Sequence, residues 1–191
     1  MAFLDKIFPL SEIPDRVLLT LSRSKLSLNL TAMLGAELKP EKWIFIVGCY
    51  NSGTTLLHNI LAQHPEIGGV TTESVELTDS LKRPEEFGWP RMWIKCLDKM
   101  REGLNENGEQ IASRVKKQWS VWFPKKRYLL EKSIANSTRI EFFENHFKPA
   151  YFIHIVRNGY AVSEEIRRCA DLNRFKNPLY SEHYPIDLCI E

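Results

Sequence analysis

The chain has 191 residues and the composition of one soluble domain, and its formal net charge of +2 gives no sign of a basic, nucleic-acid-binding surface. No apolar run approaches the roughly 18 residues of a membrane-spanning helix, so no integral membrane segment is expected. Asp5, Lys6 and Glu12 interrupt the N-terminal apolar residues, which argues against a signal peptide, and the four cysteines lack metal-ligand spacing. We therefore expect a cytoplasmic protein with free thiols.

The first predicted part is a leader over residues 1–40, with one or two short helices. We expect it to pack on the core, in preference to docking on a membrane surface. The core is predicted to span residues 41–170, so that residues 1–191 form a single domain.

The core opens with a strand, a tight loop and a helix. Residues 43–47 are apolar and rich in β-branched and aromatic side chains, which predicts a strand buried on both faces. Residues 48–53 form a polar loop with a glycine at each end. Residues 54–64 carry three leucines and one isoleucine at helical spacing, and the helix should end at His64 because Pro65 follows.

This arrangement predicts an anion-binding cradle, because a helix N-terminus presents unpaired backbone N–H groups and partial positive charge. The spacing Gly-x-x-x-x-Gly is that of a P-loop, but Thr54 and Thr55 stand where a Walker loop has lysine and serine or threonine. A nucleotide triphosphatase or kinase is therefore disfavoured. The hydroxyls of Ser52, Thr54 and Thr55 suit phosphate or sulfate oxygens, and an ordinary strand-to-helix turn is the alternative.

The next segments are less regular. Residues 66–83 are expected to form a loop, with room for a helix that carries Glu73, Glu76 and Asp79. Residues 84–127 hold four of the five tryptophans. This aromatic insertion could wall a binding cleft or form a satellite hydrophobic cluster under long loops, and both interpretations stay open.

The remaining predicted elements alternate between strand and helix, over residues 128–132, 137–147, 151–156 and about 160–170. Apolar strands alternating with helices predict a three-layer α/β/α fold with a parallel sheet covered on both faces. Ligands of such sheets bind at the carboxyl ends of the strands. The glycine loop, Lys132 and Arg157 should converge there.

At these residues the chain resembles the sulfotransferase family, which uses 3′-phosphoadenosine 5′-phosphosulfate as donor. The resemblance covers about residues 42–170. It is carried by three motifs: Asn51–Leu57 with His64-Pro65, Leu130–Ser133, and residues 152–156 with Arg157-Asn158-Gly159. The second motif is similar to the tyrosylprotein sulfotransferase branch. The resemblance implies a P-loop-like nucleotide core and sulfuryl transfer to a hydroxyl or amine of a small molecule, carbohydrate or peptide.

The resemblance also implies roles for individual residues. The donor would be bound, without a metal, by Asn51, Ser52, Gly53, Thr54, Thr55 and Arg157, with Ser163 as a further candidate. Glu73 would take the acceptor's proton, with Glu76 as second candidate, and Lys132 would stabilise the leaving phosphate. The alternatives are a solvated carboxylate for Glu73, a lysine paired with Glu131 for Lys132, and a structural ion pair for Arg157.

Two positions depart from the family pattern. Asn51 stands where the family commonly has lysine or arginine, and Glu165 stands where it usually has serine, eight residues after Arg157. Ser163 is a poor substitute, because two residues along a helix are about 200° of rotation; Arg168 could supply a second charge. A catalytically impaired nucleotide- or anion-binding module is therefore the alternative function.

The family also closes over the 3′-phosphate with a basic, glycine-containing loop. No such pattern follows Arg174 and Lys176. We expect an incomplete domain, or one that needs a partner, with the 3′ side of the site partly open.

Overall fold

The computed structural model describes residues 24–171 and contains a four-stranded parallel sheet in the order β2-β3-β1-β4. The strands are β1 (Lys42–Gly48), β2 (Ile67–Gly69), β3 (Tyr128–Glu131) and β4 (Ala150–Ile155). β1 lies in the middle and pairs with β3 on one side and β4 on the other. The predicted α/β class is confirmed.

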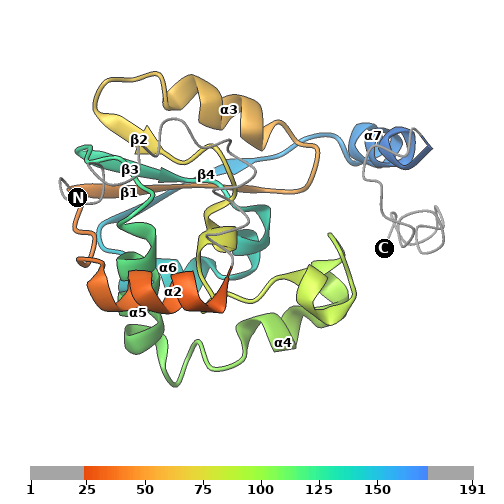
Figure 1. Cartoon of the computed structure of the whole chain (residues 1–191). Coiled ribbons are helices and arrows are strands. Elements are labelled where there is room, and N and C mark those ends of the chain that lie inside the picture. The colour runs from red at the N-terminus through yellow and green to blue at the C-terminus, as the bar shows by residue number, and fades with distance from the viewer. Residues whose placement is uncertain (1–23, 172–191) are drawn as a thin grey trace.

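Helices flank the sheet on both sides (Figure 1). They are α2 (Lys25–Leu34), α3 (Thr54–Leu61), α4 (Leu97–Arg101), α5 (Gly108–Trp119), α6 (Ile140–His146) and α7 (Gly159–Asp171). Short 3-10 helices cover Ser74–Leu77, Pro84–Phe87, Trp93–Cys96 and Ile134–Thr138. α3 covers one face, α5 and α6 cover the other, and α7 lies beyond the carboxyl ends of β1 and β4. None of the helices within residues 24–171 has the length and apolar character needed to cross a membrane.

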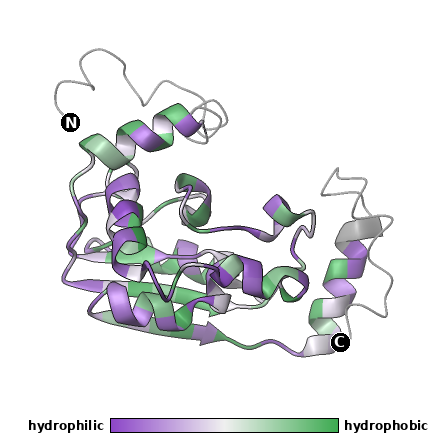
Figure 2. Ribbon diagram, turned by 90° about the horizontal axis from the view of Figure 1, so that it is seen from below, coloured by the Kyte–Doolittle hydropathy of each residue, from purple (hydrophilic) through white to green (hydrophobic). Residues whose placement is uncertain are grey.

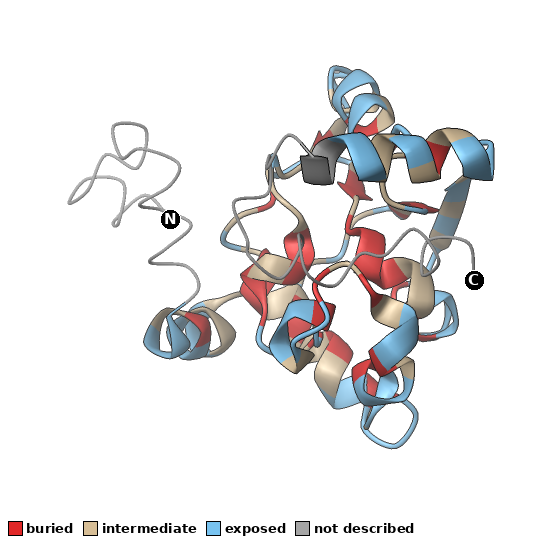
Figure 3. Ribbon diagram, turned by 90° about the vertical axis from the view of Figure 1, so that its right-hand side faces the viewer, coloured by how far each residue is buried: buried red, intermediate tan, exposed pale blue. Residues whose placement is uncertain are grey.

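The core lies between the sheet and the pair α5 and α6. Trp43, Phe45 and Val47 alternate along β1 and face this side. Trp43 meets Phe147 edge to face, with ring centroids 5.0 Å apart, and Trp119 of α5 is fully buried against the same cluster. Hydrophobic residues run along the strands, whereas hydrophobic and hydrophilic residues alternate along the helices (Figure 2). The buried residues gather in the centre of the molecule (Figure 3). The period of two along β1 therefore determines which face carries the aromatic core.

β4 differs from the prediction that both of its faces are buried. Phe152 stacks on Phe45 in the core, at 5.3 Å between ring centroids. On the opposite face Tyr151 is 51% and Ile153 36% exposed. β4 is at one edge of the described sheet, whereas His58 of α3 packs against Gly69 of β2 at the other edge.

α3 also differs from the prediction. It ends at Leu61, three residues before His64, and its buried side chains are Thr54 and His58. Leu56 and Ile60, which carried the helical pattern, are 67% and 55% exposed. The apolar spacing predicted the helix correctly but not the side that it buries.

The aromatic insertion, β2 and α5 also differ in part from what the sequence predicted. The aromatic insertion does contain a satellite cluster, in which Phe87 and Trp93 pack on Cys96 and Met100. Trp119 instead belongs to the main core. β2 and α5 were not predicted, and α2 lies in the predicted leader. Residues 1–23, and the tail with Arg174 and Lys176, fall outside the described residues.

Candidate active site

The loop between β1 and α3 has the backbone of an anion cradle. Ser137 fixes the end of β1, since its Oγ accepts the Gly48 N–H at 3.0 Å. Asn51 lies in the left-handed region with φ of 59°, and Gly53, which caps α3, has φ of 96°. A Cβ on Gly53 would meet no protein atom within 4 Å, so backbone conformation rather than crowding requires glycine here, and the space beside it is open to a ligand.

Two polar atoms of this loop fit an anionic ligand. Among the described residues, Asn51 Nδ2 and Ser52 Oγ are buried and have no hydrogen-bond partner. Leaving a buried polar group unsatisfied is unfavourable by about 1–3 kcal/mol, so such groups mark places where a partner binds. They lie directly before the N-terminus of α3, where no side chain caps the free N–H groups. The donor set therefore fits a phosphate or phosphosulfate group.

A cavity of about 340 Å³ opens beside the loop. Its lining comes from five parts of the chain: Tyr50, Asn51, Gly53, Thr54, Thr55, Glu73, Arg91, Ile134, Arg157 and Glu165. The structure thus brings most of the predicted donor-binding residues, and the predicted base, around one pocket. Lys132, Ser52 and Ser163 are not among the lining residues.

Arg157 lies directly beside the loop. It follows β4, and its Nη1 donates to the Asn51 carbonyl oxygen at 2.7 Å. Ser163 and Glu165 lie further along α7, and only Glu165 lines the pocket. Glu165 pairs with Arg168 at 3.0 Å, so the charge of Arg168 is compensated within α7.

The two predicted catalytic side chains contact each other. Lys132 Nζ lies 3.0 Å from Glu73 Oε1, and the lysine side chain is only 10% exposed. Lys132 therefore pairs with Glu73 and not with Glu131, the partner considered from sequence. Glu76 accepts a hydrogen bond from Thr72 and does not line the pocket, so the geometry favours Glu73 over Glu76.

Glu131 has a role that the sequence did not indicate, because a charged residue at a strand end is usually solvated. Its side chain is fully buried, and burial raises the pKa of its carboxyl group. Ser74 Oγ donates to Glu131 Oε1 at 2.6 Å, and Ser133 Oγ also bonds that oxygen. Ser133 Oγ in turn accepts the Val75 N–H at 3.1 Å. Glu131 thereby ties the end of β3 to the segment that carries Glu73.

Arg91 is the second residue that sequence reasoning missed. Its Nη2 donates to Asn51 Oδ1 at 3.1 Å, and its guanidinium carbon lies 4.4 Å from the centroid of the Tyr50 ring. It belongs to the aromatic insertion, 40 residues after Asn51. No motif at Arg91 signals this contact, which only the tertiary fold creates.

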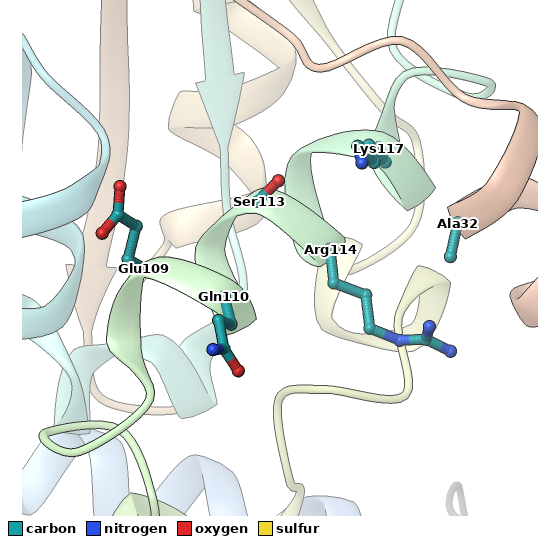
Figure 4. Close-up of a pocket in the computed structure, with 6 residues that line it drawn as sticks. All are labelled: Ala32, Glu109, Gln110, Ser113, Arg114 and Lys117. Atoms are coloured by element: carbon teal, nitrogen blue, oxygen red, sulfur yellow. The ribbon is translucent and has the colours of Figure 1, made fainter.

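A second, larger groove lies between α2 and α5, with a volume of about 460 Å³ (Figure 4). All but one of its labelled side chains come from α5, and Glu109 and Arg114 point to opposite sides. Arg114 is already paired with Asp79 at 2.6 Å. Among residues 24–171, no strand end or glycine loop lines this groove, so the pocket beside Gly53 is the stronger candidate.

The comparisons with known proteins agree with this location. A family model described as "Sulfotransferase family" matches residues 43–190, a range that includes the loop, Glu73, Lys132 and Arg157. A search of curated proteins finds no match. A search of solved structures also finds none.

Proposed function

The chain belongs to the sulfotransferase family, and from this premise we propose that it transfers a sulfuryl group from 3′-phosphoadenosine 5′-phosphosulfate to a hydroxyl or amine acceptor. Membership makes the chain a transferase and implies use of this donor. The observation that carries the proposal is the pocket beside Gly53, where unsatisfied loop atoms, a carboxylate and a guanidinium group converge.

The 5′-phosphosulfate is held by the loop. Backbone N–H groups of residues 51–55 and the hydroxyls of Ser52, Thr54 and Thr55 supply the donors, and the N-terminus of α3 supplies positive potential. Arg157 binds the 3′-phosphate: this is the role that its place in the motif Arg157-Asn158-Gly159 implies, it lines the pocket, and a planar guanidinium group suits a phosphate. Ser163, which lies in α7 outside the pocket lining, stays a further candidate.

Glu73 acts as the base. It lines the pocket, and the acceptor oxygen must lose its proton as it attacks the sulfur. Lys132 faces the negative charge that develops on the bridging phosphate oxygen as the sulfur–oxygen bond breaks. In the ground state Lys132 is paired with Glu73; once Glu73 has taken the proton, that pairing weakens and the ammonium group can interact with the leaving phosphate. A fixed cation in this place is worth about 3 kcal/mol.

The motif Leu130–Ser133 favours the tyrosylprotein sulfotransferase branch, and the acceptor is a small molecule, carbohydrate or peptide. One continuous sheet and core within residues 41–170 favours a single domain. Cys49 and Cys96 are free thiols, in keeping with a cytoplasmic location.

The alternative is a nucleotide- or anion-binding module of the same fold without activity. One observation favours it: Glu165 lines the pocket and places a carboxylate where the donor's negative charge would lie. The transfer assay separates the two functions. The protein is incubated with sulfate-labelled donor and a panel of phenols, sugars and peptides, with Glu73→Gln as control. We expect label on at least one acceptor with the wild type only; binding of 3′,5′-adenosine bisphosphate without any transfer would favour the module.

A further inference from the structure

Arg91 has an unfavourable backbone conformation. Among the described residues, Asn51 and Arg91 are the two non-glycine residues with φ in the left-handed region, at 59° and 63°. Asparagine tolerates this region well, whereas a long side chain does so rarely. The two residues touch, through the 3.1 Å bond from Arg91 Nη2 to Asn51 Oδ1. Two such residues in contact at a pocket mark a place that the surrounding structure holds for a functional reason.

The turn around Arg91 makes the choice of residue more informative. The Met92 N–H bonds the Trp89 carbonyl oxygen at 3.0 Å, so residues 89–92 form a turn with Pro90 and Arg91 at its centre. Proline followed by a residue with positive φ is the type II pattern, whose third position normally takes glycine or asparagine. Arginine at this position is therefore not explained by turn formation.

The side chain of Arg91 is held against the loop. Its guanidinium group lies over the Tyr50 ring at 4.4 Å, and Tyr50 in turn packs on Trp93 with ring centroids 5.7 Å apart. Arg157 donates to the backbone carbonyl oxygen of the same residue, Asn51. Two guanidinium groups thus approach Asn51 from separate segments, and both line the cavity.

We propose that Arg91 is a donor-binding residue that contacts the 5′-phosphate; this inference rests on the proposed function. Residues 48–55 of the loop contain no lysine or arginine, and Lys132 is paired with Glu73. Arg91, from the aromatic insertion over residues 84–127, places its guanidinium group at the side chain of Asn51. Asn51 lies in the loop that is proposed to hold the 5′-phosphosulfate of the donor. A charge-assisted contact from arginine to phosphate meets the need for a cation at that end.

The test compares two ligands by isothermal titration calorimetry. The substitution is Arg91→Gly, because glycine suits the turn and removes the charge. We expect affinity for 3′,5′-adenosine bisphosphate and for 5′-AMP to fall equally, by about tenfold, the scale of one charge-assisted hydrogen bond. The melting temperature should not fall. Lys95→Ala, which removes one exposed positive charge outside the pocket, should bind both ligands as the wild type does.

Arg157→Ala supplies the contrast, since it should weaken binding of the bisphosphate far more than binding of 5′-AMP. Unchanged affinities in Arg91→Gly would overturn the inference, and so would a loss confined to the bisphosphate, which would place Arg91 on the 3′ side. If affinity and melting temperature fall together, Arg91→Asn decides: wild-type affinity in that variant would show that Arg91 only shapes the turn. A wild-type protein that binds neither ligand would instead remove the proposed function and the inference with it.

Discussion

The ion pair between Lys132 and Glu73 joins the end of β3 to the segment after β2, across 59 residues of sequence. The lysine side chain is 10% exposed and the glutamate side chain 31%. A pair this sheltered from solvent holds both groups in place more firmly than a surface pair, which typically contributes under about 1 kcal/mol. Removing either partner leaves the other without its counter-charge, so the two roles have to be separated by kinetics.

Glu73→Gln should abolish proton transfer while leaving the loop intact. We expect kcat to fall by about 100-fold or more, the usual range for loss of a general base, with unchanged affinity for 3′,5′-adenosine bisphosphate. Steady-state kinetics and calorimetry measure the two quantities. Glu76→Gln is the matched control, since Glu76 does not line the pocket. Wild-type turnover in Glu73→Gln would eliminate Glu73 as the base.

Lys132→Ala should affect the chemical step more than donor binding. The ammonium group is bonded to Glu73 in the ground state and is needed when charge builds up on the leaving phosphate. Single-turnover rates should fall by a larger factor than the affinity for the donor product. If both quantities stayed at wild-type values, Lys132 would have no part in the reaction.

Glu131→Gln should change how stability depends on pH. Burial raises the pKa of Glu131 above its ordinary value of 4.5, so the folded protein holds this proton to higher pH than the unfolded chain. Wild-type stability from this group is complete below about pH 4.5 and is lost as pH rises toward the folded-state pKa. Glutamine does not titrate, so the stability of the variant relative to the wild type, measured by urea unfolding, should rise as the pH increases above about 4.5. Parallel curves would show that folding does not shift the pKa of Glu131.

At the scale of the elements, hydrophobic periodicity predicted β1, α3, β3, β4, α6 and α7. It missed β2, because Ile67–Gly69 is three residues long and two of them are glycine. It also assigned the wrong buried face to α3. Gly53 sets the start of that helix, and Gly69 leaves room for His58, since a Cβ at Gly69 would lie 2.5 Å from His58 Nε2. Gly69 of the neighbouring strand thus makes room for a buried histidine where the apolar spacing predicted leucines.

The exposure of β4 can be tested with a matched pair on neighbouring strands. Ile46 and Ile153 are register partners on the same face, but Ile46 is fully buried and Ile153 is 36% exposed. Ile46→Ala should lower the free energy of unfolding by about 2–5 kcal/mol, and Ile153→Ala by about 1 kcal/mol or less. Chemical denaturation measures both. Equal losses would mean that Ile153 is covered in solution.

At the scale of the whole molecule, the parallel sheet explains why the site assembles. Parallel order places the carboxyl ends of β1, β3 and β4 at one edge, so the meeting of the loop and Arg157 at one pocket could be predicted from sequence. Lys132 is connected to this pocket through its pair with Glu73. The contacts of Arg91 with Asn51 and of Lys132 with Glu73 could not, because irregular segments carry Arg91 and Glu73 to that edge. Their path depends on the turn at residues 89–92 and on the serine contacts of Glu131.

Binding of 3′,5′-adenosine bisphosphate to the wild-type protein in the presence of EDTA tests the central claim most directly. The loop N–H groups, the N-terminus of α3 and the guanidinium groups beside Asn51 supply the positive potential. Calorimetry should therefore show one binding site, with the same affinity before and after magnesium is added. Absence of binding, or binding that strictly requires magnesium, would contradict the account.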